Sequence, residues 1–212
     1  MNSYPTQMNL EAVTRRERSL SEPRYGISLI AGRPLDGPVV EAILNLQLQI
    51  ANIIQNGLIL MDPKLVHITI FRGQSSVSPC NTSIQPPPVL SATFNDIAPV
   101  TLGWREIMID FDGAIRAYTS PSVWPFPSQR QAHAVTRILS DSYGVQISVQ
   151  QRLWATLGTL QGIACQPRLI KETRALIGHY TIPEITINCL KLLYYQDLQL
   201  VLADTIEVYD LQ

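Results

Sequence analysis

The 212-residue sequence has little charge and few of the residues that build metal or redox sites. Charged residues make up 16% and the formal net charge is −1, so no overall attraction to a nucleic-acid backbone or an anionic membrane is expected. The three cysteines form no CxxC pair, which argues against a disulfide framework and a zinc site. We find no signal-like segment and no apolar run of about 18 residues, so the expected location is cytoplasmic.

Several common catalytic motifs are also missing. No glycine-rich phosphate loop follows a predicted strand, and the sequence contains neither a Gly-x-Ser-x-Gly elbow nor an HExxH helix. Asp110 and Asp112 flank Phe111 beside a predicted hairpin, where a solvated turn is a better interpretation than a metal-binding carboxylate pair. No metal and no cofactor are therefore predicted.

Hydrophobic residues make up 46% of the chain, which is enough to bury a sizeable core. We predict a single domain over residues 23–212. Residues 1–22 are polar and carry the cluster Arg15, Arg16 and Arg18, which is typical of a solvated tail.

Hydrophobic periodicity predicts an alternation of strands and helices that resembles one α+β unit used twice. Glycines after the helices and the hairpin signal Asp112-Gly113 supply the breaks. The predicted strands are residues 25–31, 66–72, 92–98, 104–111, 114–119 and 152–160, and a final antiparallel pair at 185–195 and 200–209. The predicted helices are residues 37–55, 129–143 and 168–177, and residues 74–90 have the composition of a loop.

The segment KLVHITIFRG, residues 64–73, combines strand-forming residues with chemically active ones. In an extended strand successive side chains point to opposite faces. This alternation predicts one packed face and one functional face, the latter with His67, Thr69 and Phe71. Arg72 follows at the end of the strand.

A second segment, RLWATLGTL, repeats this pattern later in the chain. When the two are aligned, Thr156 matches Thr69 and Trp154 matches His67. The sequence here resembles the 2H phosphoesterase superfamily, which includes 2'-5' RNA ligase-like and cyclic phosphodiesterase proteins. Its members carry two His-x-Thr/Ser motifs on the inner strands of two lobes, and the resemblance covers residues 25–211 approximately.

The resemblance implies an α+β fold of two pseudo-symmetric lobes, each an antiparallel sheet with outer helices, around a central cleft. It implies metal-independent cleavage of a phosphodiester of a nucleotide or RNA end, such as a 2',3'-cyclic phosphate or a 2'-5' linkage. His67 would be the acid or base, because imidazole titrates near neutrality. Thr69 and Thr156 would donate to the phosphate oxygens, and Arg72 would be an auxiliary phosphate contact.

The sequence departs from this family at Trp154, because an indole cannot exchange a proton in this pH range. Three alternatives follow: an enzyme in which water or another side chain fills the missing role, a nucleotide- or RNA-binding module with reduced catalysis, and a likeness of fold only. In the second alternative Trp154 would be a stacking wall for a base. His133 and His179 are weaker candidates for the missing imidazole, and His67 itself has the alternative of a core histidine.

Overall fold

A nine-stranded antiparallel sheet carries the fold in a computed structural model that describes residues 8–75, 86–94, 97–120, 129–197 and 199–211. The strands are β1 Tyr25–Gly32, β2 Leu58–Leu60, β3 His67–Ser75, β4 Val100–Ile109, β5 Ala114–Ser120, β6 Gln146–Leu160, β7 Ile185–Ile187, β8 Cys189–Tyr195 and β9 Ala203–Asp210. The helices are α1 Leu10–Ser21, α2 Gly37–Ile53, α3 Pro88–Phe94, α4 Gln129–Tyr143 and α5 Pro167–Ile177, with a 3₁₀ turn, η1, at Gly162–Ala164.

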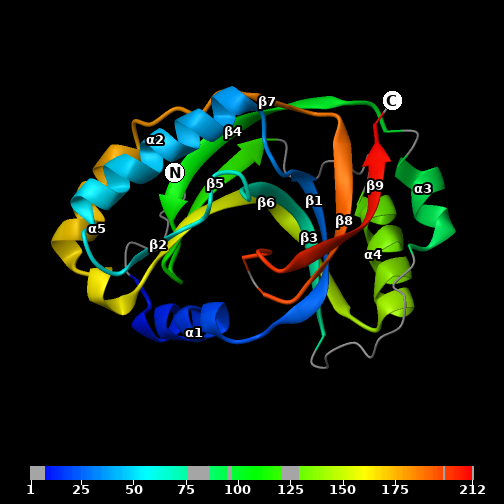
Figure 1. Ribbon diagram of the computed structural model, residues 1–212, viewed down its shortest axis with the longest axis horizontal. Helices are drawn as coiled ribbons and strands as arrows, with labels where there is room; N and C mark the ends of the chain where they lie inside the picture. The colour runs from blue at the N-terminus through cyan, green and yellow to red at the C-terminus, as the bar shows by residue number, and fades with distance from the viewer. Residues whose placement is uncertain (1–7, 76–85, 95–96, 121–128, 198, 212) are drawn as a thin grey trace.

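The strand order is β7-β4-β5-β6-β3-β1-β8-β9, with β2 added on β6. The sheet curls strongly, and helices flank it at both ends (Figure 1). Strands β3 and β6, which carry the two related segments, are neighbours in its middle. The α+β class is confirmed. The structure does not confirm two pseudo-symmetric lobes, because the strands form one continuous sheet.

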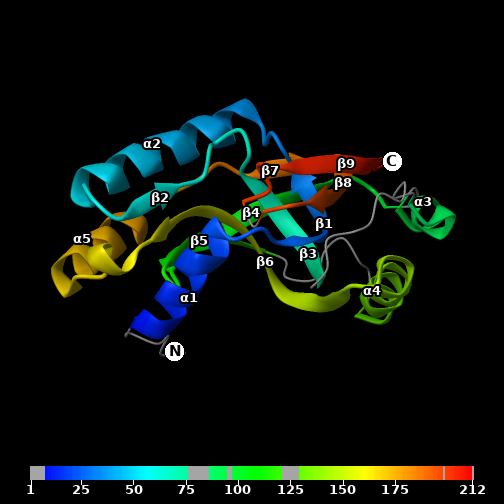
Figure 2. The same ribbon diagram turned by 60° about the horizontal axis from the view of Figure 1, so that its bottom comes forward.

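Helix α2 packs on one face of the sheet through an apolar stripe at helical spacing, formed by Val39, Ile43, Leu46 and Ile50. Gln47 lies within this buried surface, and its amide nitrogen donates to two main-chain carbonyl groups. Helix α5 lies beside α2, whereas α1 lies on the other side of the strands (Figure 2).

Helix α1 lies where the polar composition of residues 1–22 predicted a solvated tail. The Asn9 side chain caps the helix by accepting a hydrogen bond from the Ala12 amide at 3.1 Å. Val13 is fully buried, and the Asn9 amide donates to the Phe111 carbonyl of the β4–β5 loop. One fully buried apolar side chain, a main-chain bond and polar side-chain contacts, such as the Gly162 amide bond to the Glu17 carboxylate, therefore hold a helix that hydropathy does not reveal. The assignment of residues 23–212 to one domain stays a prediction.

The strand predicted at residues 92–98 is wrong, because residues 88–94 form helix α3. Leu90 and Phe94 lie one turn apart and are both fully buried, and the Phe94 ring lies 4.8 Å from the Tyr209 ring. Pro88 suits the first turn of a helix, where its missing amide hydrogen is not needed. Residues 76–85 of the predicted loop lie outside the described part of the chain.

The other predicted strands and helices are present, although several of their bounds differ, and the short strand β2 was not predicted. The predicted strand 185–195 is divided at Asn188, so that β7 pairs with β4 while β8 pairs with β9. Strand β6 begins at Gln146, six residues before the predicted start. The β4–β5 hairpin has a loop at residues 110–113, closed by the Asp110 amide bond to the Ala114 carbonyl, with Gly113 at a φ of 82°. Positive φ favours glycine at this position.

Candidate active site

A small cavity of about 110 Å³ opens on the sheet face opposite α2. It is much smaller than the roughly 300–1,000 Å³ of sites that enclose a drug-sized ligand, so it suits a group such as phosphate. All five residues that the sequence predicted for the site line it. The lining residues are Arg16, Leu20, Ile59, Met61, His67, Thr69, Arg72, Arg116, Trp154, Thr156, Gly158, Thr159 and Gln199.

Strand pairing places the predicted residues in two rows across the sheet. Thr69 on β3 lies opposite Trp154 on β6, which lies opposite Tyr118 on β5. Ile68 lies opposite Ala155, so the same register one step further sets His67 against Thr156. Residues directly opposite share a face and have Cβ atoms about 4.5–5.5 Å apart. On the far side of β6, Arg116 lies opposite Thr156 and extends this second row.

A β-bulge in β3 changes the face on which its last residues point. Leu29 of β1 pairs with Phe71 and Ile30 with Thr69, which leaves Ile70 as an extra residue. One extra residue reverses the alternation beyond it. Arg72 therefore returns to the cavity beside Thr69, and Phe71 is fully buried in the core. The prediction that Phe71 shares a face with His67 and Thr69 is wrong for this reason.

His67 is buried, with an exposed fraction of 5%, and lines the cavity. Its Nδ1 lies 2.8 Å from the Leu65 carbonyl oxygen, which can only accept, so Nδ1 carries the proton and Nε2 of the neutral ring holds a lone pair. Burial, together with the positive charges of Arg72 and Arg33, lowers the pKa of His67 to about 4, although the hydrogen bond to Leu65 opposes this. The imidazole is therefore neutral at pH 7 and has the protonation state of a general base.

Arg72 is a cation held in the cavity without a carboxylate partner among the described residues. Its guanidinium carbon lies 5.2 Å from the centre of the Tyr195 ring, and its Nε is buried without a hydrogen-bond acceptor in the described part of the chain. The Tyr195 hydroxyl itself donates to the Gly73 carbonyl at 2.9 Å. Burial lowers the pKa of Arg72, although Tyr195 and Asp197 oppose this. An anion in the cavity would supply the missing partner.

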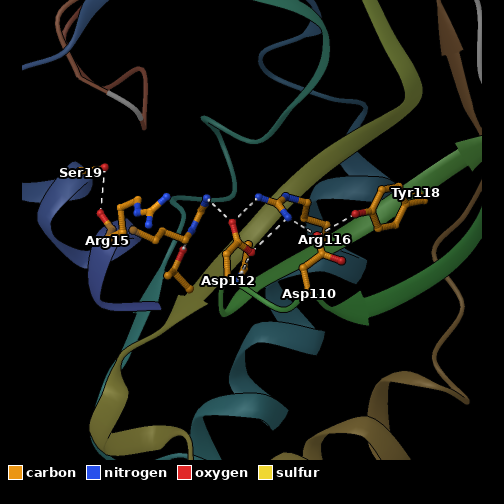
Figure 3. A network of polar contacts seen from close by, with 9 residues as sticks. Arg15, Ser19, Asp110, Asp112, Arg116 and Tyr118 are labelled. Carbon is orange, nitrogen blue, oxygen red and sulfur yellow. Dashed lines mark hydrogen bonds and ion pairs between the residues drawn. The ribbon is translucent and has the colours of Figure 1, made fainter. Parts of the chain in front are cut away.

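Arg116 forms ion pairs with both acidic residues of the β4–β5 loop (Figure 3). Its Nη2 lies 2.9 Å from Asp112 Oδ2, and its Nη1 contacts Asp110. The Tyr118 hydroxyl donates to Asp110 at 2.7 Å. The exposed fractions of the Asp110 and Asp112 side chains are 11% and 19%, so the prediction of a solvated turn is wrong. The carboxylates orient cavity arginines.

Arg16 of α1 joins this network from the other side of the cavity. Its Nη1 lies 3.3 Å from Asp112 Oδ2, and its Nε donates to Thr159 Oγ1 at 3.1 Å. Burial, together with the positive charges of Arg116 and Arg72, lowers the pKa of Arg16 to about 10, although Asp112 opposes this. Arg16 and Arg116 share Asp112, and all three arginines line one cavity, so their charges act on the same space.

Asp112 is the acidic centre of this environment. Burial raises its pKa, but Arg116 and Arg16 outweigh burial and hold the pKa below the ordinary value. Burial likewise lowers the pKa of Arg116, and Asp112 and Asp110 outweigh it and raise that pKa above its ordinary value. Asp112 and Arg116 therefore stay charged at all physiological pH values.

Trp154 is half-buried and fixed by its neighbours. The Arg116 guanidinium lies 5.6 Å from the centre of its ring, and the Tyr118 ring lies 6.3 Å away at an angle of 56°. Cation–π contacts of this kind hold an aromatic plane in place. Trp154, which aligns with His67 in the second segment, thus forms a rigid aromatic surface at the cavity wall.

Sequence reasoning missed Arg16, Arg116, Thr159 and Gln199, which also line the cavity. The alternation of β5 could have indicated Arg116, but nothing local marks Arg16. His133 and His179 are exposed and do not belong to the lining residues described here. The described residues contain no group of three or more His, Cys, Asp or Glu arranged to hold a metal ion. Nor does any described helix combine the length and apolar character needed to cross a membrane.

No protein-family model matches the sequence, and no curated protein matches it. Among solved structures, a conserved protein of unknown function from Agrobacterium tumefaciens is similar with a TM-score of 0.47 and 11% identity, over 100% of this chain and 93% of that one. Usb1 of Kluyveromyces marxianus is similar with a TM-score of 0.39 and 8% identity, over 87% of this chain and 97% of that one. Likenesses this weak carry no argument, so membership of the 2H phosphoesterase superfamily stays a prediction from the sequence.

Proposed function

We propose that the chain is a 2H phosphoesterase-like protein that binds and cleaves a phosphodiester of a nucleotide or RNA end, either a 2',3'-cyclic phosphate or a 2'-5' linkage. One observation carries this proposal: a neutral imidazole, two threonine side chains and a guanidinium that has no ion pair in the described part of the chain line the same small cavity. A phosphodiester needs a base for the attacking oxygen and donors for its non-bridging oxygens. His67 supplies the first, and Thr69, Thr156 and Arg72 supply the second.

For a 2',3'-cyclic phosphate, Nε2 of His67 takes a proton from the attacking water as the new P–O bond forms. The bond from phosphorus to one ribose oxygen breaks, and that oxygen keeps the electron pair. The hydroxyls and Arg72 stabilise the charge that develops on the non-bridging oxygens. Trp154 cannot protonate the leaving oxygen, so solvent water supplies that proton. Cleavage is therefore slower than with two imidazoles, by about 10²- to 10⁴-fold.

A second candidate function is a nucleotide- or RNA-binding module with little or no catalysis. The fixed plane of Trp154 favours it, because a base can stack on such a surface with about 1–3 kcal/mol. The described lining residues also contain a single imidazole, that of His67. Both functions use the same phosphate site and differ only in turnover.

The experiment measures binding and turnover separately, without added metal and with EDTA. The wild-type chain, His67→Ala and the exposed control His133→Ala are incubated with 2',3'-cyclic mononucleotides and a 2'-5'-linked dinucleotide. Turnover that falls at least 100-fold only in His67→Ala supports the enzyme. Binding without turnover supports the module, and the absence of both overturns the two candidate functions together.

A further inference from the structure

The charges around the cavity come close to balance but leave an excess of one. Arg16, Arg72 and Arg116 contribute three positive charges, and Asp110 and Asp112 contribute two negative ones. Asp112 is shared between Arg16 and Arg116 and so neutralises charge on both sides of the site. The remaining positive charge corresponds to Arg72, the guanidinium without an ion pair among the described residues.

The other described titratable groups near the three arginines do not change the net charge of plus one. His67 is neutral at pH 7 because of its lowered pKa. Arg33 and Asp197 both influence the cavity and carry opposite charges. Tyr118 and Tyr195 have raised pKa values, because burial opposes their ionisation, and they stay neutral.

We propose that the cavity is matched to a singly charged phosphodiester and discriminates against a doubly charged phosphate monoester, with Asp112 as the residue that sets this specificity. This inference rests on the proposed function. A diester carries one negative charge, whereas a monoester carries nearly two above its second pKa of about 6. The second charge meets no further cation among the described lining residues, and the carboxylate of Asp112, which contacts two lining arginines, repels it with a field that is screened less than in bulk water.

The proposed discrimination favours product release. Hydrolysis of a 2',3'-cyclic phosphate turns a singly charged substrate into a doubly charged monoester, which the site binds more weakly. Asp112 touches Arg16 and Arg116 rather than lining the cavity, so it acts as a positioning residue through its charge.

The test compares the dissociation constants of cytidine 2',3'-cyclic monophosphate and cytidine 3'-monophosphate at pH 8 and pH 5 with the His67→Ala chain, which cannot turn the ligand over. At pH 8 the cyclic diester binds about tenfold more tightly, the size expected for one unit charge several ångströms away at an effective dielectric constant between those of a protein surface and bulk water. At pH 5 the monoester is largely singly charged, so the ratio of its dissociation constant to that of the cyclic diester falls toward one. Asp112 stays ionised at pH 5, because its pKa is lowered.

Two further substitutions are made in the His67→Ala chain, one that removes a negative charge and one that removes a positive charge. Asp112→Asn raises affinity for the monoester about tenfold and lowers the ratio, while Arg16→Gln weakens both ligands and raises the ratio. A general loss of structure cannot produce the two opposite shifts. Asp141→Asn, which neutralises an exposed carboxylate on α4, leaves the ratio unchanged.

The charge-matching proposal is overturned if the monoester binds as tightly as the cyclic diester at pH 8, or if neither substitution moves the ratio. In both cases the nucleotides still bind, so the proposed function stands. If neither nucleotide binds to the wild-type chain, the proposed function and the charge matching fail together.

Discussion

Thr69 on β3 lies directly opposite Trp154 on β6, and both residues line the same cavity. The two related segments run antiparallel, so the first position of each motif faces the third position of the other. His67 therefore faces Thr156, and Trp154 faces Thr69. A local two-fold axis between the strands relates the two pairs, so the indole of Trp154 occupies the position equivalent to that of His67. The position for a second imidazole is therefore present in the strand pairing, and Trp154 occupies it.

Replacing Trp154 with histidine is expected to increase turnover of 2',3'-cyclic mononucleotides by about 10²-fold or more, because it adds a second group able to transfer a proton. Steady-state kinetics of Trp154→His and the wild-type chain provide the measurement. Trp154→Phe keeps an aromatic ring without a titratable nitrogen and should not gain activity. An equal gain in the phenylalanine variant would show that relief of steric crowding is responsible.

Stability should decrease as the pH falls from about 6.5 toward 4. In this range the unfolded chain binds a proton at His67 while the folded chain does not, because the folded pKa is about 4. The shift corresponds to a loss on the order of 3 kcal/mol in the free energy of unfolding. Urea unfolding at pH 7, 5 and 4 measures it. The curve for His67→Gln should be flatter by this amount, and identical curves for the two chains would contradict the lowered pKa.

Arg72→Ala should weaken binding of cyclic nucleotides by about 10- to 100-fold, since hydrogen bonds to charged groups contribute about 1.5–3 kcal/mol. Arg72→Lys keeps the charge but lacks the planar fork, and should recover only part of the affinity. Isothermal titration calorimetry at low and moderate salt gives both values. The exposed Arg105 on β4 supplies the control, Arg105→Ala, with unchanged affinity. An equal loss in the control would indicate a nonspecific effect of charge.

Gln47→Leu should reduce the free energy of unfolding by about 2 kcal/mol, because buried carbonyl groups lose a donor. The Gln47 amide donates to the Met61 carbonyl at 2.7 Å and to the Leu157 carbonyl at 2.8 Å, and so ties α2 to the strands around the cavity. Leu48→Ala, at an exposed neighbouring position, should change little. Denaturant unfolding measures both variants. If Gln47→Leu is as stable as the wild type, the two carbonyls are satisfied in another way.

The sequence allowed most helices and strands to be predicted where apolar periodicity was clear, as in α2, α4 and β1. It misassigned α3 because a short apolar run fits a strand or a buried helix equally well. Only the packing of Leu90 and Phe94 decides between them. Helix α1 was missed because its single fully buried residue, Val13, carries too little signal against many polar neighbours.

The candidate site was predictable as far as its residues belong to β3 and β6, where local motifs mark His67, Thr69 and Thr156. Arg16 could not be predicted, because it reaches the cavity only through contacts with Asp112 and Thr159, far away in the sequence. The same holds for Arg116 and its carboxylates. The roles of these residues in catalysis stay predictions.

The bulge at Ile70 makes the cavity depend on residue spacing as well as on residue identity. If residues 67–72 formed a regular strand without the bulge, the alternation would carry the guanidinium of Arg72 into the hydrocarbon interior and bring the phenyl ring of Phe71 to the cavity. Because Ile70 is the extra residue, a chain that lacked only Ile70 would form a regular strand and keep both side chains on their present faces. Comparisons of related chains should therefore allow a one-residue gap at this point when they search for the counterpart of Arg72.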